Sequence, residues 1–118
     1  MSLTPAQTTL SLSGKLLTLE RPVVMGIVNV TPDSFFAGSR IAGETALRTR
    51  FDQLVSEGAA IADLGAYSSR SGADEVSVTE EMERLRPALR ILRDEYPDLP
   101  VSVDTFRSEV ARMAVEEY

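Results

Sequence analysis

The chain has 118 residues, enough for one small domain with a modest hydrophobic core. Its 18 acidic and 12 basic residues give a net charge of −6, which argues against a broad surface for nucleic acid or for an anionic membrane. Cysteine and histidine are absent, which excludes disulfides, Cys/His zinc sites, thiol nucleophiles and imidazole bases within this chain. The lack of cysteine is typical of cytoplasmic proteins, and the apolar runs are too short to span a membrane, so we expect a cytoplasmic location.

The first expected elements are two short strands in TTLSLSGKLLTLE, joined at Ser13 and Gly14 as a β-hairpin. Pro22 then precedes the nearly continuous apolar run VVMGIVNV. Because polar residues do not alternate with apolar ones there, the run predicts a strand that is buried on both faces, as in parallel sheets. It ends in a polar heptapeptide, NVTPDSF, at residues 29–35.

A helix is predicted from about Ala42 to Ser56, with a stop at Gly58. The apolar residues of its expected inner face recur at helical spacing: Leu47, Phe51, Leu54 and Val55. AAIADLG predicts a second buried strand, and the polar loop AYSSRSGADEV follows it.

SVTE at residues 77–80 is a capping box and predicts the start of a second helix. Pro87 predicts a kink or a restarted helix, and the charged run EEMERLR is interpreted as a solvated face. The expected inner face consists of Met82, Leu85, Leu89, Leu92 and Tyr96.

DLPVSVD predicts a third strand, and TFRSEVARMAVEEY predicts a third helix with Val110, Met113 and Ala114 facing inward. A hairpin followed by three strand–helix units implies an α/β fold with right-handed crossovers and a parallel sheet. Polar residues follow each of these strands: Asn29, then 68–70, then Asp104. Since the carboxyl ends of parallel strands meet at one edge, where α/β folds bind ligands, we expect a site there.

Each strand-end motif has two readings. The Asn29 amide can contact Mg²⁺ or a phosphate, or Asn29 can simply be a turn residue. YSSRSG, with Arg70, can clamp an anion or be a solvated loop. Asp104 can accept hydrogen bonds from ligand N–H groups, or Asp104 or Thr105 can cap the helix that follows.

Three segments in this order, MGIVNVTPDSF, ADLGAYSSRSG and VSVDT, resemble the signatures of the dihydropteroate synthase family. The resemblance covers roughly residues 14–118 and implies the N-terminal portion of a TIM (β/α)8 barrel. Residues 1–21 would form the N-terminal hairpin, and residues 22–118 the first three β/α units of a single partial domain. A TIM barrel needs eight such units and about 250 residues, so the resemblance implies an N-terminal fragment of a synthase.

The resemblance also implies a function and a site. Members condense 6-hydroxymethyl-7,8-dihydropterin diphosphate with p-aminobenzoate, giving dihydropteroate and diphosphate for folate biosynthesis, with Mg²⁺. Asn29 would contact the metal and the diphosphate, Arg70 would be the catalytic loop arginine, and Asp104 would contact the pterin ring. The other expected substrate-binding residues are Ser69, Thr31, Asp33 and Phe35.

This chain departs from the family pattern at Ala66 and Tyr67, at Ala37 and at Ser71. Ser71 replaces a proline beside the p-aminobenzoate pocket, which is where sulfonamides compete, and it predicts weaker sulfonamide binding. We expect the isolated chain to lack a complete site and to be inactive. Its open sheet would expose residues such as Val28 and Ile61, which predicts a homodimer or other self-association.

Two alternatives remain open on the sequence. One is another pterin-binding barrel, such as a methyltetrahydrofolate:corrinoid methyltransferase, which does not need the diphosphate loop NVTPDSF. The other is a non-catalytic interaction fragment.

Overall fold

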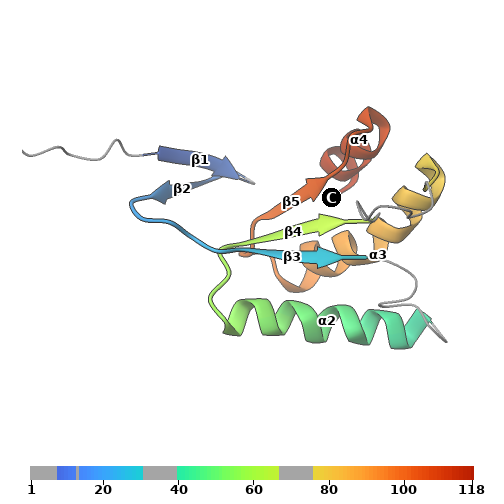
Figure 1. Ribbon diagram of the computed structural model, residues 1–118, viewed down its shortest axis with the longest axis horizontal. Helices are drawn as coiled ribbons and strands as arrows, with labels where there is room; N and C mark the ends of the chain where they lie inside the picture. The colour runs from blue at the N-terminus through green and yellow to red at the C-terminus, as the bar shows by residue number, and fades with distance from the viewer. Residues whose placement is uncertain (1–7, 13, 31–39, 67–75) are drawn as a thin grey trace, which may run out of the picture.

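A computed structural model describes residues 8–12, 14–30, 40–66 and 76–118. The elements follow the predicted order of a hairpin and three strand–helix units (Figure 1). Their bounds are β1 (Thr8–Leu12), β2 (Lys15–Leu19), β3 (Met25–Asn29), α2 (Arg40–Ser56), β4 (Ile61–Gly65), α3 (Val78–Glu95), β5 (Val101–Asp104) and α4 (Ser108–Glu117).

Strands β3, β4 and β5 form a parallel sheet in that order, which confirms the predicted α/β class. β1 and β2 form a separate antiparallel hairpin, in which Gly14 takes a φ of +74° that favours glycine. The hairpin lies at the amino-terminal end of the parallel strands (Figure 1). An ion pair between Lys15 Nζ and Asp98 Oδ1, at 2.7 Å, links the hairpin to the loop before β5.

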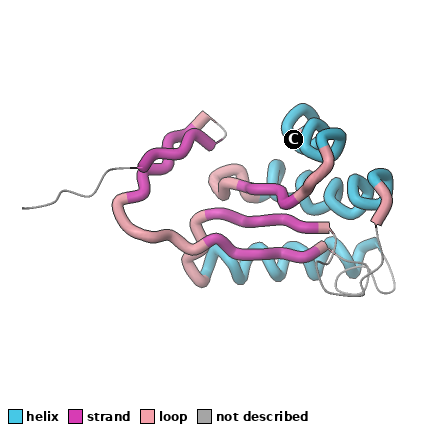
Figure 2. Tube along the Cα trace, turned by 45° about the horizontal axis from the view of Figure 1, so that its top comes forward, coloured by secondary structure: helices cyan, strands magenta, loops and turns pink. Residues whose placement is uncertain are grey.

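The hydrophobic core lies between one face of this sheet and the helices. In Figure 2 the three strands run side by side in front of α2 and α3. Val28, Leu64, Phe51 and Leu85 are among its fully buried members, each at most 1% exposed. The predicted inner residues of α3 and α4 are confirmed as buried or half-buried. None of the described helices is long and apolar enough to cross a membrane.

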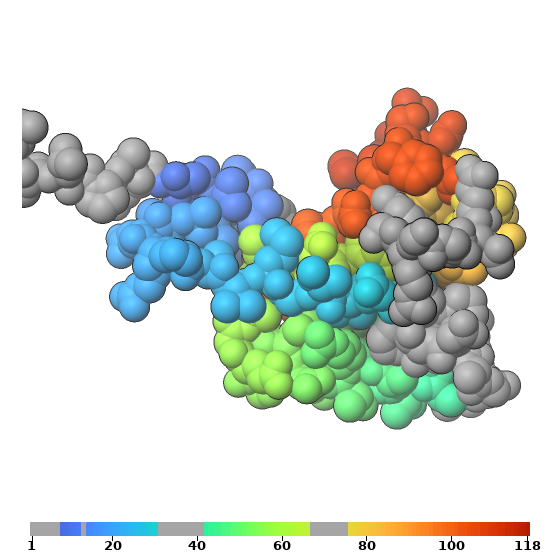
Figure 3. Space-filling view, in the orientation of Figure 1, coloured from blue at the N-terminus to red at the C-terminus, as the bar shows by residue number. Residues whose placement is uncertain are grey.

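The prediction that the first parallel strand is buried on both faces is wrong. In β3 exposure alternates: Gly26 and Val28 are buried, whereas Met25 and Ile27 are 48% and 60% exposed. Gly26 faces Leu54 of α2, so residues of the opposite parity face away from the helices. Atoms of β3 accordingly lie uncovered on the face shown in Figure 3.

The expectation that Val28 and Ile61 are exposed is also wrong. Val28 faces the helices and is 1% exposed. Ile61 pairs in register with Met25, but it belongs to the central strand and is only 6% exposed. The open face therefore exposes the apolar residues of the edge strand β3 rather than those of the middle strand.

Three expectations for the helices also need correction. Val55 of α2 is 51% exposed, although Leu47, Phe51 and Leu54 are buried as predicted. α3 is one helix that includes Pro87, so it does not restart there, and the expected kink stays a prediction. The run EEMERLR is solvated only in part, because Glu80 and Glu83 are exposed but Glu81 is completely buried.

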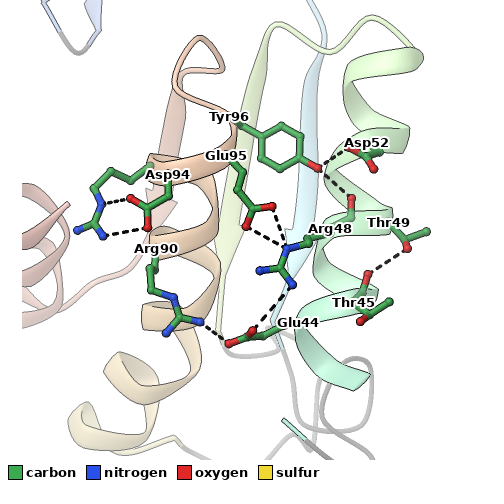
Figure 4. Close-up of polar contacts among 10 residues, drawn as sticks. Glu44, Thr45, Arg48, Thr49, Asp52, Arg90, Asp94, Glu95 and Tyr96 are labelled. Carbon is green, nitrogen blue, oxygen red and sulfur yellow. Dashed lines mark hydrogen bonds and ion pairs between the residues drawn. The ribbon is translucent and has the colours of Figure 1, made fainter. Parts of the chain in front are cut away.

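Ion pairs join α2 to α3 across their exposed edge (Figure 4). Glu44 pairs with Arg90, and Arg48 Nε lies 2.9 Å from both carboxylate oxygens of Glu95. Arg48 Nη1 is also 3.9 Å from Glu44 Oε2 on its own helix. The pairs share partners and form a network, which stabilises more than isolated surface pairs do.

Tyr96, at the end of α3, reaches across to α2. Its hydroxyl donates a hydrogen bond to Asp52 (Figure 4). Its ring packs edge-on against Phe51 with centroids 5.7 Å apart. Burial and the hydrogen bond to Asp52 raise the pKa of Tyr96 to about 12. The contact therefore holds the C-terminal end of α3 against α2 while the phenol is protonated.

Candidate functional site

Three residues form one row across the carboxyl ends of the parallel strands. Asn29 of β3 pairs in register with Gly65 of β4, and Gly65 pairs with Asp104 of β5. With neighbouring strands about 5 Å apart, Asn29 and Asp104 lie roughly 10 Å from each other across Gly65. The expectation that Asn29 and Asp104 meet at one edge of the sheet is confirmed.

Gly65, which is buried, places no side chain in the middle of this row. A β-carbon placed there would lie 3.5 Å from Asn29 Oδ1 and 4.0 Å from Asp104 Cβ. Asn29 and Asp104 are both exposed, so their polar groups border the space that the glycine leaves. The row can therefore receive a flat polar ligand between an amide and a carboxylate.

The alternative role of Asn29 as a turn residue does not fit its place in the sheet. Asn29 is part of β3, and the next residue continues the pairing, with Val30 N donating to Gly65 O at 2.6 Å. The side chain is therefore held at a fixed strand position, on the same face as Ile27.

The alternative role of Asp104 as a helix cap is wrong. α4 begins at Ser108 and its N-cap position is Arg107. The Thr105 hydroxyl accepts a hydrogen bond from Arg107 N at 3.2 Å, which closes the turn after β5. The Asp104 carboxylate makes no hydrogen bond or ion pair with the described residues and is available to a ligand.

Two residues closer to the amino-terminal end of each strand, the same face of the sheet carries another pair of polar side chains. Ile27, Asp63 and Ser102 share the next register row on the same face. The Ser102 hydroxyl donates to Asp63 Oδ1, which fixes the Asp63 carboxylate in the sheet. A ligand bound next to Gly65 would therefore contact side chains that are held in fixed positions.

The N-terminal half of α3 supports the strand ends through two residues that were not predicted from the sequence. Arg84 Nη1 donates to the carbonyl of Ala66, directly after β4, at 2.9 Å. Glu81 Oε1 accepts from Arg107 Nη1, in the turn after β5, at 3.0 Å. Their i,i+3 spacing, which puts both on one helix face, was the available signal.

Several expected site residues lie outside the described residues: Thr31, Asp33, Phe35, Ser69, Arg70 and the departure at Ser71. Within the described ranges no group of three or more His, Cys, Asp or Glu side chains can hold a metal ion. Asn29 is therefore the described residue on which the expected metal contact rests.

Comparison with known proteins gives the family. The family model described as "Pterin binding enzyme" matches residues 25–118. This chain belongs to the pterin-binding enzymes. The matched range holds all three parallel strands and thus the complete Asn29–Gly65–Asp104 row.

The relatives within the pterin-binding enzymes include dihydropteroate synthases, which confirms the resemblance of the three motifs. The synthase of Synechocystis sp. is 44% identical to this chain over 97 residues. The match covers 82% of this chain and 33% of the Synechocystis synthase.

Two solved structures agree. The Xanthomonas albilineans synthase with 4-aminobenzoic acid is 45% identical, with a TM-score of 0.78 over 92% of this chain and 40% of its own. The Burkholderia cenocepacia synthase complexed with 7,8-dihydropteroate is 36% identical, with a TM-score of 0.74 over 98% of this chain and 36% of its own. The chain thus spans a little over a third of their length, and its sheet and helices form part of a TIM barrel.

Proposed function

We propose that this chain supplies the pterin-facing strand ends of a dihydropteroate synthase. The reaction joins 6-hydroxymethyl-7,8-dihydropterin diphosphate to p-aminobenzoate and releases dihydropteroate and diphosphate. The observation that carries the proposal is the Asn29–Gly65–Asp104 row, because a residue without a side chain lies between an amide and a carboxylate that has no partner among the described residues. The synthases solved with 4-aminobenzoic acid and with 7,8-dihydropteroate share this fold.

Asp104 is the proposed pterin-recognition residue. A pterin ring presents neighbouring N–H groups along one edge, and an ionised carboxylate accepts two such hydrogen bonds side by side. Gly65 would let the flat ring approach the backbone of β4, and the rigid sheet would hold Asp104 in place.

Asn29 is the proposed contact to Mg²⁺ and the diphosphate. Mg²⁺ prefers oxygen ligands and is commonly held by one or two protein groups together with substrate phosphates and waters. The exposed amide oxygen of Asn29 beside the Gly65 space fits such a shared site. When bound, Mg²⁺ would neutralise charge on the departing diphosphate.

The remaining assignments follow from the family motifs. Arg70 and Ser69 are proposed to bind the diphosphate and the p-aminobenzoate side of the site, and Thr31, Asp33 and Phe35 are proposed to close over it. In the reaction, the p-aminobenzoate nitrogen forms a bond to the pterin methylene carbon. The carbon–oxygen bond to diphosphate breaks, and the amine loses its proton to solvent. This chemistry needs orientation and charge neutralisation rather than imidazole or thiol groups, so a site without His or Cys suits it.

A chimera tests the proposal directly. Residues 25–118 replace the corresponding segment of the Xanthomonas albilineans synthase, and dihydropteroate formation from labelled p-aminobenzoate is measured. We expect an active chimera that loses activity with Asp104→Ala and keeps it with Glu109→Ala, an exposed position on α4. A folded chimera that is inactive, or one unaffected by Asp104→Ala, would refute the proposal. Pterin binding that does not depend on diphosphate would favour the methyltransferase alternative.

A further inference from the structure

Glu81 is the one charged side chain that is completely buried in the described part of the chain. It lies in the first turn of α3, with Oε1 accepting the hydrogen bond from Arg107. Oε2 is buried and has no hydrogen-bond partner among the described residues. Such a half-satisfied carboxylate needs a physical explanation.

Arg107 closes the turn that begins at Asp104. Its backbone N–H is bonded to the Thr105 hydroxyl, and its guanidinium lies 4.8 Å from the centre of the Phe106 ring. The Arg107 side chain is only 14% exposed. Glu81 therefore holds the last residue of a short turn whose first residue borders the candidate site.

Stability alone does not account for the Glu81–Arg107 pair. Replacing a buried ion pair with apolar residues of similar volume is often neutral or stabilising, and the unpaired Oε2 adds a further cost. The pair instead fixes the direction of the Arg107 side chain, because a charge-assisted hydrogen bond to a planar guanidinium sets both the distance and the angle between the two groups. One turn further along α3, Arg84 fixes the Ala66 carbonyl beside Gly65 in a similar way.

We propose that Glu81 is a positioning residue for pterin recognition, which fixes the turn that directly follows Asp104 by means of Arg107. It acts without touching the ligand. The inference rests on the proposed role of Asp104, and it adds a residue that sets how tightly Asp104 binds the pterin.

A double-mutant cycle in the chimera described above tests it, with binding of 7,8-dihydropteroate measured by isothermal titration. We expect Glu81→Gln to weaken binding about tenfold, as loss of a supporting contact behind a ligand-binding group typically does. Combined with Asp104→Asn, the same change is expected to add less than about twofold, because its effect runs through Asp104. Additive losses would overturn the inference, since a general structural defect would persist without the Asp104 charge.

A second variant guards against simple unfolding. Glu81→Met/Arg107→Met removes the ion pair but keeps the volume buried, so the fold is expected to survive. Amide hydrogen exchange at residues 105–107 is expected to accelerate in this variant, with exchange in α2 unchanged. Glu117→Gln is the matched control, because it breaks the exposed Arg86–Glu117 pair between α3 and α4, away from the turn after β5, and is expected to change neither readout.

The two proposals can fail separately. If the unsubstituted chimera folds but binds no dihydropteroate, the proposed function fails. Accelerated exchange in the Glu81→Met/Arg107→Met variant would still support Glu81 as the residue that holds the turn after β5. Unchanged exchange there overturns the positioning role, whatever the site binds.

Discussion

Replacing Gly65 with alanine is expected to stabilise the fold and to weaken the site at the same time. The new methyl group would lie 3.5 Å from Asn29 Oδ1 and 4.0 Å from Asp104 Cβ, which is ordinary van der Waals contact. The fold therefore accepts it without moving either neighbour. The space that it fills is the space proposed for the pterin ring.

The size of both effects follows from the geometry. Glycine inside a strand is less favourable than alanine by about 0.5–1 kcal/mol, because a chain with glycine there loses more conformational entropy on folding. For a domain of this length that gain raises Tm by roughly 2–5 °C. A methylene-sized intrusion into a fitted pocket weakens binding by about 1–3 kcal/mol, or roughly 10–200-fold.

Gly26→Ala is the matched control, since it makes the same change in the neighbouring strand. There the new β-carbon would lie 2.3 Å from Leu54 Cδ2, whose side chain is only 3% exposed. Overpacking of this kind costs about 1–3 kcal/mol, so the control is expected to lower Tm. The Gly26→Ala change leaves the Asn29–Gly65–Asp104 row intact.

The assay is a thermal melt of each variant of the chain by circular dichroism, beside a titration of the same variant of the chimera with 7,8-dihydropteroate. The reasoning predicts opposite signs for Gly65→Ala: a higher Tm and weaker binding. A Gly65→Ala chimera that binds as tightly as the unsubstituted chimera would refute the assignment of this space to the ligand. A Tm of Gly65→Ala below that of the unsubstituted chain would refute the packing argument.

Three further predictions concern other parts of the fold. Because its raised pKa of about 12 exceeds the ordinary value of 10.0, the Tyr96 hydroxyl contributes stability that is fully present below pH 10 and lost as the pH rises through 12. In urea titrations the stability difference between the unsubstituted chain and Tyr96→Phe should therefore shrink over that range; a constant difference would contradict it. Arg84→Met removes the hydrogen bond to the carbonyl after β4 and should lower the free energy of unfolding by about 1 kcal/mol, whereas no change would contradict its supporting role. Met25→Thr/Ile27→Thr makes the open sheet face polar and should reduce self-association in sedimentation velocity, and an unchanged profile would contradict an interface there.

The strand-end positions of Asn29 and Asp104 were predictable because they depend on local signals. Apolar runs mark the strands, helical periodicity marks the crossovers, and parallel topology then brings the strand ends to one edge. The role of Asp104 was ambiguous in the sequence, since an aspartate before a helix is also a common cap. The structure resolves this because the chain makes a turn through Thr105 and Arg107 before α4 begins.

The errors arose where tertiary contacts decide burial. A continuous apolar run does not reveal which parity faces the helices, so the exposure of Met25 and Ile27 was not predictable from VVMGIVNV. A charged run on a helix is usually solvated, yet Glu81 is buried because Arg107, 26 positions further along the chain, meets it. Only the fold brings those two residues together.

The register of Asn29, Gly65 and Asp104 also bears on how such a chain tolerates insertions and deletions during evolution. Each residue of the row belongs to a different strand, and the helices between the strands reach the row only through their loops. Extra residues in a loop at the amino-terminal end of the strands, such as the one after α2, would leave the row in place. Loss of a single residue inside Ile61–Gly65 would instead turn Leu64 toward the open face and carry Gly65 out of line with both partners. Length variation among descendants should therefore accumulate in the loops and be nearly absent from these strands.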